Sequence, residues 1–207
     1  MKFETKAIHG EKKDKSKQID WSNTISMASA YPTREFGVDE EFQYGRVSNP
    51  TRKELEKTIA RLENGKYGFA FSSGMAAIVS VFTKFKAGDH IVLGIDIYGG
   101  TYRIMTEIFA KFNLEYTFID TTDLEAVKKA VKSNTVAIFI ETPSNPLLDV
   151  TDIREIVKIA KEHNILSIVD NTFLTPYLQR PLELGVDMVI HSATKFLSGH
   201  HDIIAGI

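Results

Sequence analysis

Short apolar runs alternate with amphipathic segments along most of the chain from Tyr67 onward. A short apolar run bounded by polar residues is typical of a buried strand, and apolar positions three or four apart are typical of a helix. Strands are therefore predicted at 68–71, 90–94, 116–119, 136–141, 165–170 and 188–191, and helices at 75–85, 102–112, 124–131, 153–163 and 182–185. Apolar strands separated by helices predict an α/β fold with a mostly parallel sheet covered by helices on both faces.

The first part of the chain lacks this periodicity, so an extended N-terminal arm without its own core is predicted over 1–48. A helix is predicted to begin at Asn49, because asparagine caps helices and the proline after it suits the first turn, and to end at Asn64. The domain built on the sheet is expected to span 49–207. The apolar run at 203–207 resembles a strand that has just begun, which indicates a domain incomplete at its C-terminal end.

Composition and charge exclude several classes of protein. The 207 residues carry a formal net charge of −2, which gives no electrostatic support to a nucleic-acid or membrane-surface partner. The sequence has no cysteine, which excludes disulfides, thiolate metal ligands and a cysteine nucleophile. The apolar runs are shorter than a membrane span, and the N-terminal residues lack the apolar core of a signal peptide. These features predict a cytoplasmic protein.

Polar and small residues follow the predicted strands. In a parallel sheet, ligands bind at the carboxyl ends of the strands. Five of the six predicted strands are followed there by such residues, namely Ser72-Ser-Gly74-Met75, Asp96-Ile-Tyr98-Gly-Gly100, Glu141-Thr-Pro-Ser-Asn145, Asp170-Asn-Thr and Ser192-Ala-Thr194-Lys195. A plain turn or a helix cap explains any one of them, whereas their recurrence at one sheet edge predicts a ligand site.

The segment after the last predicted strand carries a candidate nucleophile. Lys195 follows a buried strand, and partial burial there favours the neutral amine that forms a Schiff base with an aldehyde. Ser192 and Thr194 are two residues apart, which in an extended chain places both hydroxyls on one side, where they can hold a phosphate. Gly74 and Met75 begin a predicted helix and offer backbone N–H groups to the same anion.

One ligand matches all of these groups: pyridoxal 5′-phosphate (PLP), an aromatic aldehyde with a phosphate, a ring nitrogen and a phenolic oxygen. Lys195 is predicted to form the Schiff base, and Asp170 is predicted to face the ring nitrogen and keep it protonated. Tyr98 is predicted to stack on the ring, and Asn145 to reach the phenolic oxygen. The phosphate is assigned to Gly74, Met75, Ser192 and Thr194.

These motifs, in their order and spacing, resemble those of the PLP-dependent transsulfuration enzymes of cysteine and methionine metabolism. The motifs are Tyr44-Gly-Arg46-Val-Ser-Asn-Pro-Thr, Phe71-Ser-Ser-Gly-Met-Ala-Ala, Tyr98-Gly-Gly-Thr, Glu141-Thr-Pro-Ser-Asn-Pro, Val169-Asp-Asn-Thr and His191-Ser-Ala-Thr-Lys. That family includes cystathionine γ-synthase, cystathionine γ-lyase, cystathionine β-lyase, methionine γ-lyase and homoserine-ester sulfhydrylases. The resemblance implies the aspartate-aminotransferase-like fold of type I PLP enzymes. Chains of that family continue into a C-terminal domain, which we expect to be absent from these 207 residues.

The resemblance also implies roles that spacing alone does not give. It implies that Lys195 carries the cofactor and later moves protons, and that Tyr98 assists proton transfer and departure of the leaving group. Tyr44 and Arg46 would contact the cofactor phosphate of a neighbouring subunit, which implies a homodimer with shared active sites and a homotetramer built from two such dimers. The implied substrates are cystathionine, homoserine esters or related sulfur amino acids. Elimination and replacement, at Cβ or Cγ, all stay open.

Two other hypotheses stay open at this point. A truncated chain would bind the cofactor yet lack the residues that grip an amino-acid substrate, and so would not turn over. A metal hydrolase using His191, His200, His201 and Asp202 is the other hypothesis, although the sequence has no histidine pair at helical spacing to support it. Gly100 stands where methionine γ-lyases typically carry a cysteine, which counts against that activity, and His201 has no assigned role.

Overall fold

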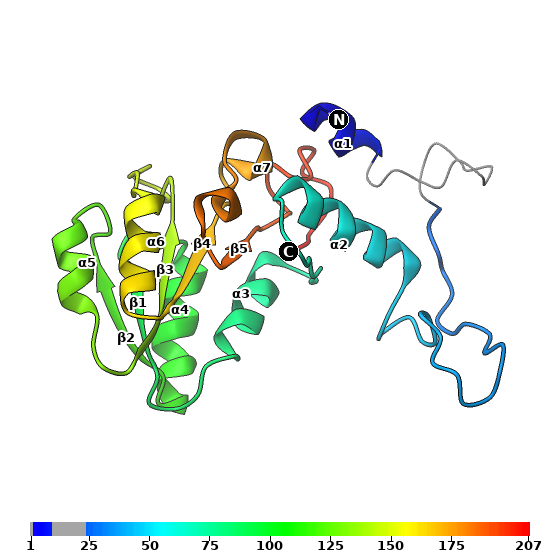
Figure 1. Ribbon diagram of the computed structural model, residues 1–207, viewed down its shortest axis with the longest axis horizontal. Coiled ribbons are helices and arrows are strands. Elements are labelled where there is room, and N and C mark those ends of the chain that lie inside the picture. The colour runs from blue at the N-terminus through cyan, green and yellow to red at the C-terminus, as the bar shows by residue number, and fades with distance from the viewer. Residues whose placement is uncertain (1, 10–23) are drawn as a thin grey trace. The chain divides into compact units, whose positions relative to one another are not determined.

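The chain divides into two compact units, Met1–Ala70 and Phe71–Ile207, in a computed structural model that describes residues 2–9 and 24–207 (Figure 1). Residues 10–23 of the predicted arm lie outside the described part. Within the described part, no helix combines the length and the apolar character needed to cross a bilayer. The first unit holds α1 (Phe3–His9) and α2 (Pro50–Leu62).

The second unit is built on a five-stranded parallel sheet with the order β2-β1-β3-β4-β5. This confirms the predicted α/β fold with a parallel sheet. The strands are β1 (His90–Gly94), β2 (Glu115–Ile119), β3 (Thr135–Glu141), β4 (Leu166–Asp170) and β5 (Met188–Ile190). The helices are α3 (Gly74–Phe82), α4 (Gly99–Glu107), the 3-10 helix η1 (Phe109–Phe112), α5 (Leu124–Ala130), α6 (Ile153–Glu162), α7 (Thr175–Leu178) and the 3-10 helix η2 (Pro181–Leu184).

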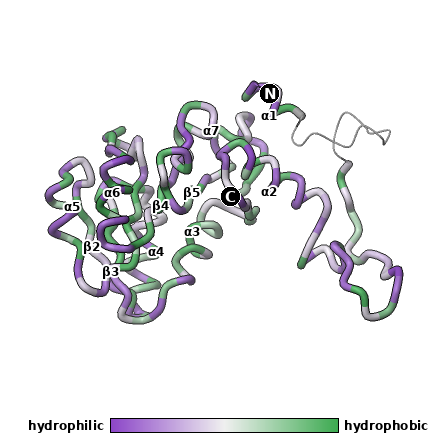
Figure 2. Tube along the Cα trace, in the orientation of Figure 1, coloured by the Kyte–Doolittle hydropathy of each residue, from purple (hydrophilic) through white to green (hydrophobic). Residues whose placement is uncertain are grey.

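Helices cover both faces of the sheet (Figure 1). On one face Leu93 and Phe139 pack in a core with Phe82 of α3. On the other face Val92 and Ile138 pack in a second core with residues of α5 and α6. Because successive strand residues point to opposite faces, strands covered on both sides are apolar throughout. The helices are covered on one side only, and in Figure 2 α5 and α6 carry both hydrophilic and hydrophobic colours.

The helix cap predicted at Asn49 is confirmed, and α6 begins with a cap of the same kind. The side chain of Asn49 accepts a hydrogen bond from the backbone N–H of Thr51 at 2.9 Å at the start of α2. The side chain of Asp152 accepts one from the backbone N–H of Arg154 at 2.9 Å at the start of α6. Each cap satisfies a backbone donor that the helix itself leaves without a partner, which typically contributes about 1 kcal/mol.

Two expectations about the elements need correction, and one helix was not expected. Residues 68–71 do not form a strand of the sheet, since only Phe71 pairs, in an isolated antiparallel bridge with Gly206. The helix expected over 102–112 begins earlier, as α4, and the 3-10 helix η1 follows it. Helix α7 was not expected, because its four residues are too few to show a helical period.

The last residues of the chain pair with two segments at the edge of the sheet. The backbones of Gly206 and Phe71 exchange hydrogen bonds of 3.0 and 2.7 Å. Those of Ile207 and His191 exchange hydrogen bonds of 2.9 and 2.8 Å. The end of the chain therefore lies between the segment that leads into α3 and the segment that follows β5.

Gly206→Ala is expected to destabilise the fold by about 1–3 kcal/mol, because a clash with backbone atoms cannot be relieved by a side-chain rotation. A Cβ on Gly206 would lie 2.0 Å from the carbonyl oxygen of Ser73 and 2.8 Å from the backbone nitrogen of Gly74. Urea unfolding measures the loss. Gly99→Ala is the matched control, since a Cβ there meets no atom within 4 Å. Equal unfolding midpoints for the two variants would contradict this packing.

Candidate functional site

The carboxyl ends of β3 and β4 place two acidic residues side by side. Glu141 ends β3, Asp170 ends β4, and the two are paired in the register of these adjacent strands. Both residues are buried, at 8% and 6% exposed. Neighbouring buried carboxyl groups disfavour each other's ionisation, so this edge of the sheet is suited to a cationic group.

Asp170 is held by the turn that follows it. Its Oδ1 accepts hydrogen bonds from the backbone N–H of Thr172 at 3.0 Å and from the Thr172 hydroxyl at 2.5 Å. The same hydroxyl accepts a hydrogen bond from the backbone N–H of Ser192 at 2.7 Å, which ties the ends of β4 and β5 together. Burial raises the pKa of the Asp170 carboxyl, whereas the Thr172 hydrogen bonds and the nearby His191 act in the opposite direction. A cation placed at this carboxyl would stabilise its charged form.

Glu141 contacts the loop after β1. Its Oε2 accepts a hydrogen bond from the backbone N–H of Tyr98 at 2.7 Å. Burial raises the pKa of Glu141 to about 8, and the neighbouring carboxyl of Asp170 is the second contribution to this rise. The Tyr98 hydrogen bond lowers this pKa and Asp96 adds to the rise. At neutral pH, Glu141 in this environment is therefore mostly protonated.

The stability of the cofactor-free protein is expected to fall as the pH rises from about 4.5 to about 8, because of Glu141. In the unfolded chain this carboxyl ionises at its ordinary pKa, whereas in the fold it keeps its proton up to the raised pKa. Unfolding between the two values releases a proton, which lowers stability by up to about 1.4 kcal/mol per pH unit. Urea unfolding of the wild type and of Glu141→Gln across this window measures the effect. The advantage of the variant should grow with pH, and parallel curves would contradict the raised pKa.

Tyr98 is the cap residue immediately before α4, and it is 44% exposed. A Cβ on Gly100 would lie 2.4 Å from Cε1 of Tyr98 and 2.8 Å from Sδ of Met75. A glycine is therefore needed for the tyrosine ring to lie against the first turn of α4. The exposed ring surface remains available for stacking on another ring. Asn145 lies in the loop after β3 and is also exposed.

Gly74 and Ser192 lie close together at the start of α3. A Cβ on Gly74 would lie 2.7 Å from Cβ of Ser192. The helix is capped by Ser73, whose hydroxyl accepts a hydrogen bond from the backbone N–H of Ala76 at 3.1 Å. The structure thus brings together Gly74, Met75 and Ser192, three of the four residues assigned to the phosphate, at a helix N-terminus whose dipole favours an anion.

Two expectations about the segment after β5 are wrong. The chain turns after Ser192, since the backbone N–H of Lys195 donates to the carbonyl of Ser192 at 3.0 Å, and strand alternation therefore does not align Ser192 with Thr194. The Thr194 hydroxyl donates to the carbonyl of Ala205 at 3.2 Å and accepts from its N–H at 3.1 Å. Lys195 is exposed, not partly buried, because it lies in this turn beyond the strand.

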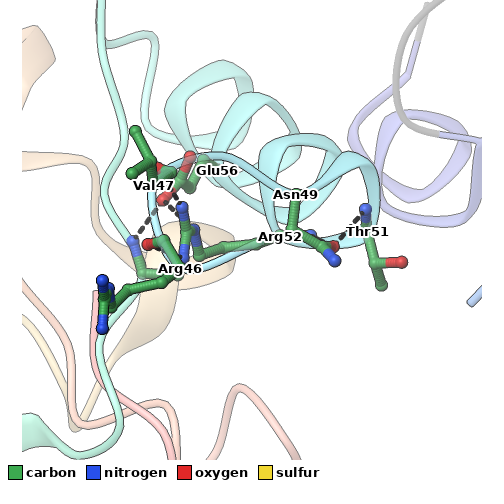
Figure 3. Close-up of polar contacts among 7 residues, drawn as sticks. Arg46, Val47, Asn49, Thr51, Arg52 and Glu56 are labelled. Carbon is green, nitrogen blue, oxygen red and sulfur yellow. Dashed lines mark hydrogen bonds and ion pairs between the residues drawn. The ribbon is translucent and has the colours of Figure 1, made fainter. Parts of the chain in front are cut away.

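Tyr44 and Arg46 belong to the first unit, in the turn before α2. The guanidinium of Arg46 lies over the ring of Tyr44, 5.1 Å from its centroid. Arg52 of α2 donates to the carbonyls of Val47 at 2.6 Å and Arg46 at 3.3 Å, and its Nε lies 3.6 Å from Oε1 of Glu56 (Figure 3). One guanidinium therefore holds the turn that presents the Tyr44–Arg46 pair.

Arg52→Ala is expected to speed tryptic cleavage after Arg46 by about tenfold or more. The variant loses two hydrogen bonds from a charged donor, each contributing about 1.5–3 kcal/mol, so the turn opens more often. Mass spectrometry of the peptide that ends at Arg46 gives the rate. Lys57→Ala, which removes an exposed side chain of the same helix, is the control. If both variants cleave at the wild-type rate, Arg52 does not hold this turn.

The histidines do not form a metal centre within the described residues, where no group of three or more histidine, aspartate or glutamate side chains is arranged to hold a metal ion. His191 is 1% exposed, whereas His200 and His201 are exposed. The backbone of His201 has a φ of 58°, in the left-handed region, so this residue contributes to the shape of the turn.

Sequence reasoning gave no separate role to Glu141, Asp96 or Thr172. A signal for Glu141 was present, because it ends a strand that is otherwise apolar. Thr172 follows Asp170 at the spacing of a side-chain-to-backbone turn, which is a second usable signal. Nothing in the sequence indicates the partner of Asp96, since that partner lies 48 residues away along the chain.

The fold and these strand ends define a cofactor-binding type of α/β domain, with its site at the carboxyl edge of a parallel sheet. A family model described as Cys/Met metabolism PLP-dependent enzyme matches residues 4–207. The chain belongs to this family, and the predicted resemblance is confirmed.

Similar proteins support the same assignment. The chain is 49% identical over 207 residues to a cystathionine gamma-lyase of Bacillus subtilis, covering 100% of this chain and 55% of the relative. It is 50% identical over 205 residues to a cystathionine beta-lyase of Lactococcus lactis subsp. cremoris, covering 99% and 54%. The crystal structure of cystathionine gamma-lyase from Lactobacillus plantarum complexed with L-serine matches with a TM-score of 0.95 at 50% identity, over 100% of this chain and 54% of that one. The chain spans about half the length of these relatives.

The family depends on PLP, and the donor chemistry of the sheet edge fits this cofactor. The buried carboxyl of Asp170 suits a protonated ring nitrogen, because burial alone disfavours its charge. The missing Cβ of Gly74 lets Ser192 approach the start of α3, which places a hydroxyl beside the backbone N–H groups that favour a phosphate. The exposed amine of Lys195 is accessible to an aldehyde.

Proposed function

We propose that this chain forms the cofactor-binding part of an enzyme that makes or breaks a carbon–sulfur bond in sulfur amino acids. The proposed substrates are cystathionine or homoserine esters, and the reaction is elimination or replacement at Cβ or Cγ. The observation that carries this proposal is the buried carboxyl of Asp170 at the end of β4. It lies in a chain of a PLP-dependent family, with Lys195 following the adjacent strand.

Each side chain of the sheet edge has a proposed task. When bound, PLP supplies an electron sink that stabilises negative charge on the substrate α-carbon. Asp170 keeps the ring nitrogen protonated, and Lys195 attaches the cofactor through Nζ and later moves the α-proton. Tyr98 stacks on the ring and assists the leaving group, and Asn145 binds the phenolic oxygen. The phosphate is held by Gly74, Met75 and Ser192, whereas the hydroxyl of Thr194 is bonded to the backbone of Ala205.

The N-terminal part of the first unit serves a neighbouring subunit in this proposal. Tyr44 and Arg46 bind the phosphate of the cofactor in that subunit, and a guanidinium suits a phosphate because its planar fork donates two hydrogen bonds. Residues 1–48 are thus an arm that contacts the neighbour, and 49–207 are the PLP-binding domain. The enzyme is a cytoplasmic homodimer with shared active sites, and two such dimers form a homotetramer.

Product analysis tests the proposal. The protein is incubated with PLP and either cystathionine or a homoserine ester with cysteine. Cysteine and 2-oxobutyrate from cystathionine indicate γ-elimination, homocysteine and pyruvate indicate β-elimination, and cystathionine from the ester indicates replacement. Bound PLP without products supports a second candidate, a cofactor-binding chain without turnover. If the protein neither binds PLP nor forms any of these products, the proposal is contradicted.

A further inference from the structure

Two carboxylates join the loops that carry Tyr98 and Asn145, and they do so in opposite directions. Glu141, at the end of β3, accepts a hydrogen bond from the backbone N–H of Tyr98 in the loop after β1, at 2.7 Å. Asp96, in the loop after β1, accepts a hydrogen bond from the hydroxyl of Ser144 in the loop after β3. Each loop thus holds the other, and we call Asp96 and Glu141 together the carboxylate clamp.

Asp96 also orders the backbone around Asn145. The Oδ2 atom that binds Ser144 also accepts a hydrogen bond from the backbone N–H of Leu147 at 3.1 Å. The Ser144 hydroxyl accepts in turn from the backbone N–H of Asp149 at 2.9 Å. Asn145 therefore lies between two residues that bind one carboxylate oxygen, although its own side chain is exposed.

The clamp lies where the strand order of the sheet reverses. β1 pairs with β2 on one side and with β3 on the other, and ligands of open α/β sheets bind at such a switch point. Ser144 is 3% exposed and Glu141 is 8% exposed. Hydrogen bonds shielded from water in this way fix geometry more firmly than bonds on an open loop.

We propose that Asp96 and Glu141 are positioning residues that hold Tyr98 and Asn145 at the separation the cofactor ring requires. This inference rests on the proposed function, in which Tyr98 stacks on the ring and Asn145 binds its phenolic oxygen. Because the two carboxylates connect the same pair of loops, losing either one loosens both loops.

The clamp requires acceptor oxygens rather than negative charge, since its donors are backbone N–H groups and a hydroxyl. Asparagine or glutamine keeps one acceptor oxygen at each place, whereas alanine keeps none. Asp96→Asn and Glu141→Gln should therefore retain the function that Asp96→Ala and Glu141→Ala lose. A role through charge, such as tuning Asp170, would instead be lost in the amide variants too.

Amide hydrogen exchange in the cofactor-free protein tests the clamp by itself. In Asp96→Ala, exchange should rise roughly tenfold at Leu147, which loses its acceptor, and also at Tyr98, which belongs to the other crossed bond. Asp120→Ala is the matched control, because its carboxylate follows the neighbouring strand β2 but binds the hydroxyl and backbone N–H of Thr122 in its own loop. That control should leave both amides unchanged.

PLP titration tests the positioning role. Each alanine variant should bind PLP roughly tenfold more weakly, the effect of about one lost hydrogen bond. The induced circular dichroism per bound PLP should also fall, because the ring is no longer held in one orientation. The amide variants and Asp120→Ala should match the wild type in both measurements. The double alanine variant should be little worse than either single one, since both residues act on one unit.

The outcomes separate this inference from the proposed function. Suppose that Asp96→Ala raises exchange at both Leu147 and Tyr98, but that the wild type binds no PLP. This result would overturn both the positioning role and the proposed function, and it would leave the clamp as a structural link between the loops. PLP binding with normal affinity and dichroism in the alanine variants would overturn the inference and leave the proposed function intact. Equal losses in the amide and alanine variants would also overturn it, in favour of a role through charge.

Discussion

Lys195→Ala is expected to abolish covalent attachment of PLP to the protein and to lower turnover by about a thousandfold or more. In the proposed site one amine has two tasks, the covalent bond to the cofactor and transfer of the α-proton. Alanine can do neither. Non-covalent PLP should still bind, because the start of α3 and Ser192 are unaltered and the lysine is exposed, so its removal leaves no cavity.

Borohydride reduction followed by peptide mass analysis measures the attachment, and product formation measures turnover. Lys195→Arg keeps the positive charge but cannot attach the cofactor, so it separates the role of the nucleophile from that of the charge. Lys111→Ala, which removes another exposed lysine of the second unit, is the control and should retain both activities. A fully active Lys195→Ala variant would remove Lys195 from the site.

Asp170→Asn is expected to change cofactor affinity and stability in opposite directions. PLP affinity should fall by about a hundredfold, because the protonated ring nitrogen loses a buried charged partner worth about 3 kcal/mol. Without cofactor the variant should be more stable than the wild type, by about 1 kcal/mol, because a buried acid beside Glu141 becomes a neutral amide. A residue that serves the fold alone would give the opposite sign of stability change.

PLP titration and urea unfolding of the cofactor-free protein give the two quantities for this variant. Asp89→Asn is the control, since Asp89 precedes β1 at the other edge of the sheet, where its carboxylate accepts from the backbone N–H of Lys86 at 3.0 Å. It should leave PLP affinity unchanged. A loss of stability in cofactor-free Asp170→Asn would show that this carboxylate serves the fold and would count against its assignment to the ring nitrogen.

The sheet was predictable because its strands are buried on both faces. A run such as Ile138 to Ile140 has no polar alternation. The segment between it and the next strand has apolar residues every three or four positions, which is typical of a helix. The segment 68–71 has the same local pattern, but the strand predicted there is wrong. Its one pairing partner is Gly206, and local pattern carries no information about a partner so distant in sequence.

The candidate site was predictable as a set of strand ends but not in its geometry. The parallel topology alone brings Asp170 near Glu141 and places Lys195 after the adjacent strand. The turn after Ser192 was missed because extended geometry was assumed beyond the strand, and that turn also sets the exposure of Lys195. The crossed bonds of Asp96 and Glu141 depend on loop conformation, which sequence periodicity does not report.

The most direct test of the central claim is the visible absorption spectrum of the protein with added PLP, followed by borohydride reduction and peptide mapping. We predict an absorption band of covalently attached cofactor and, after reduction, a label confined to the peptide that contains Lys195. This result would establish that the carboxyl edge of the sheet is a PLP site. The absence of a band, or a label spread over surface lysines, would contradict the account at its centre.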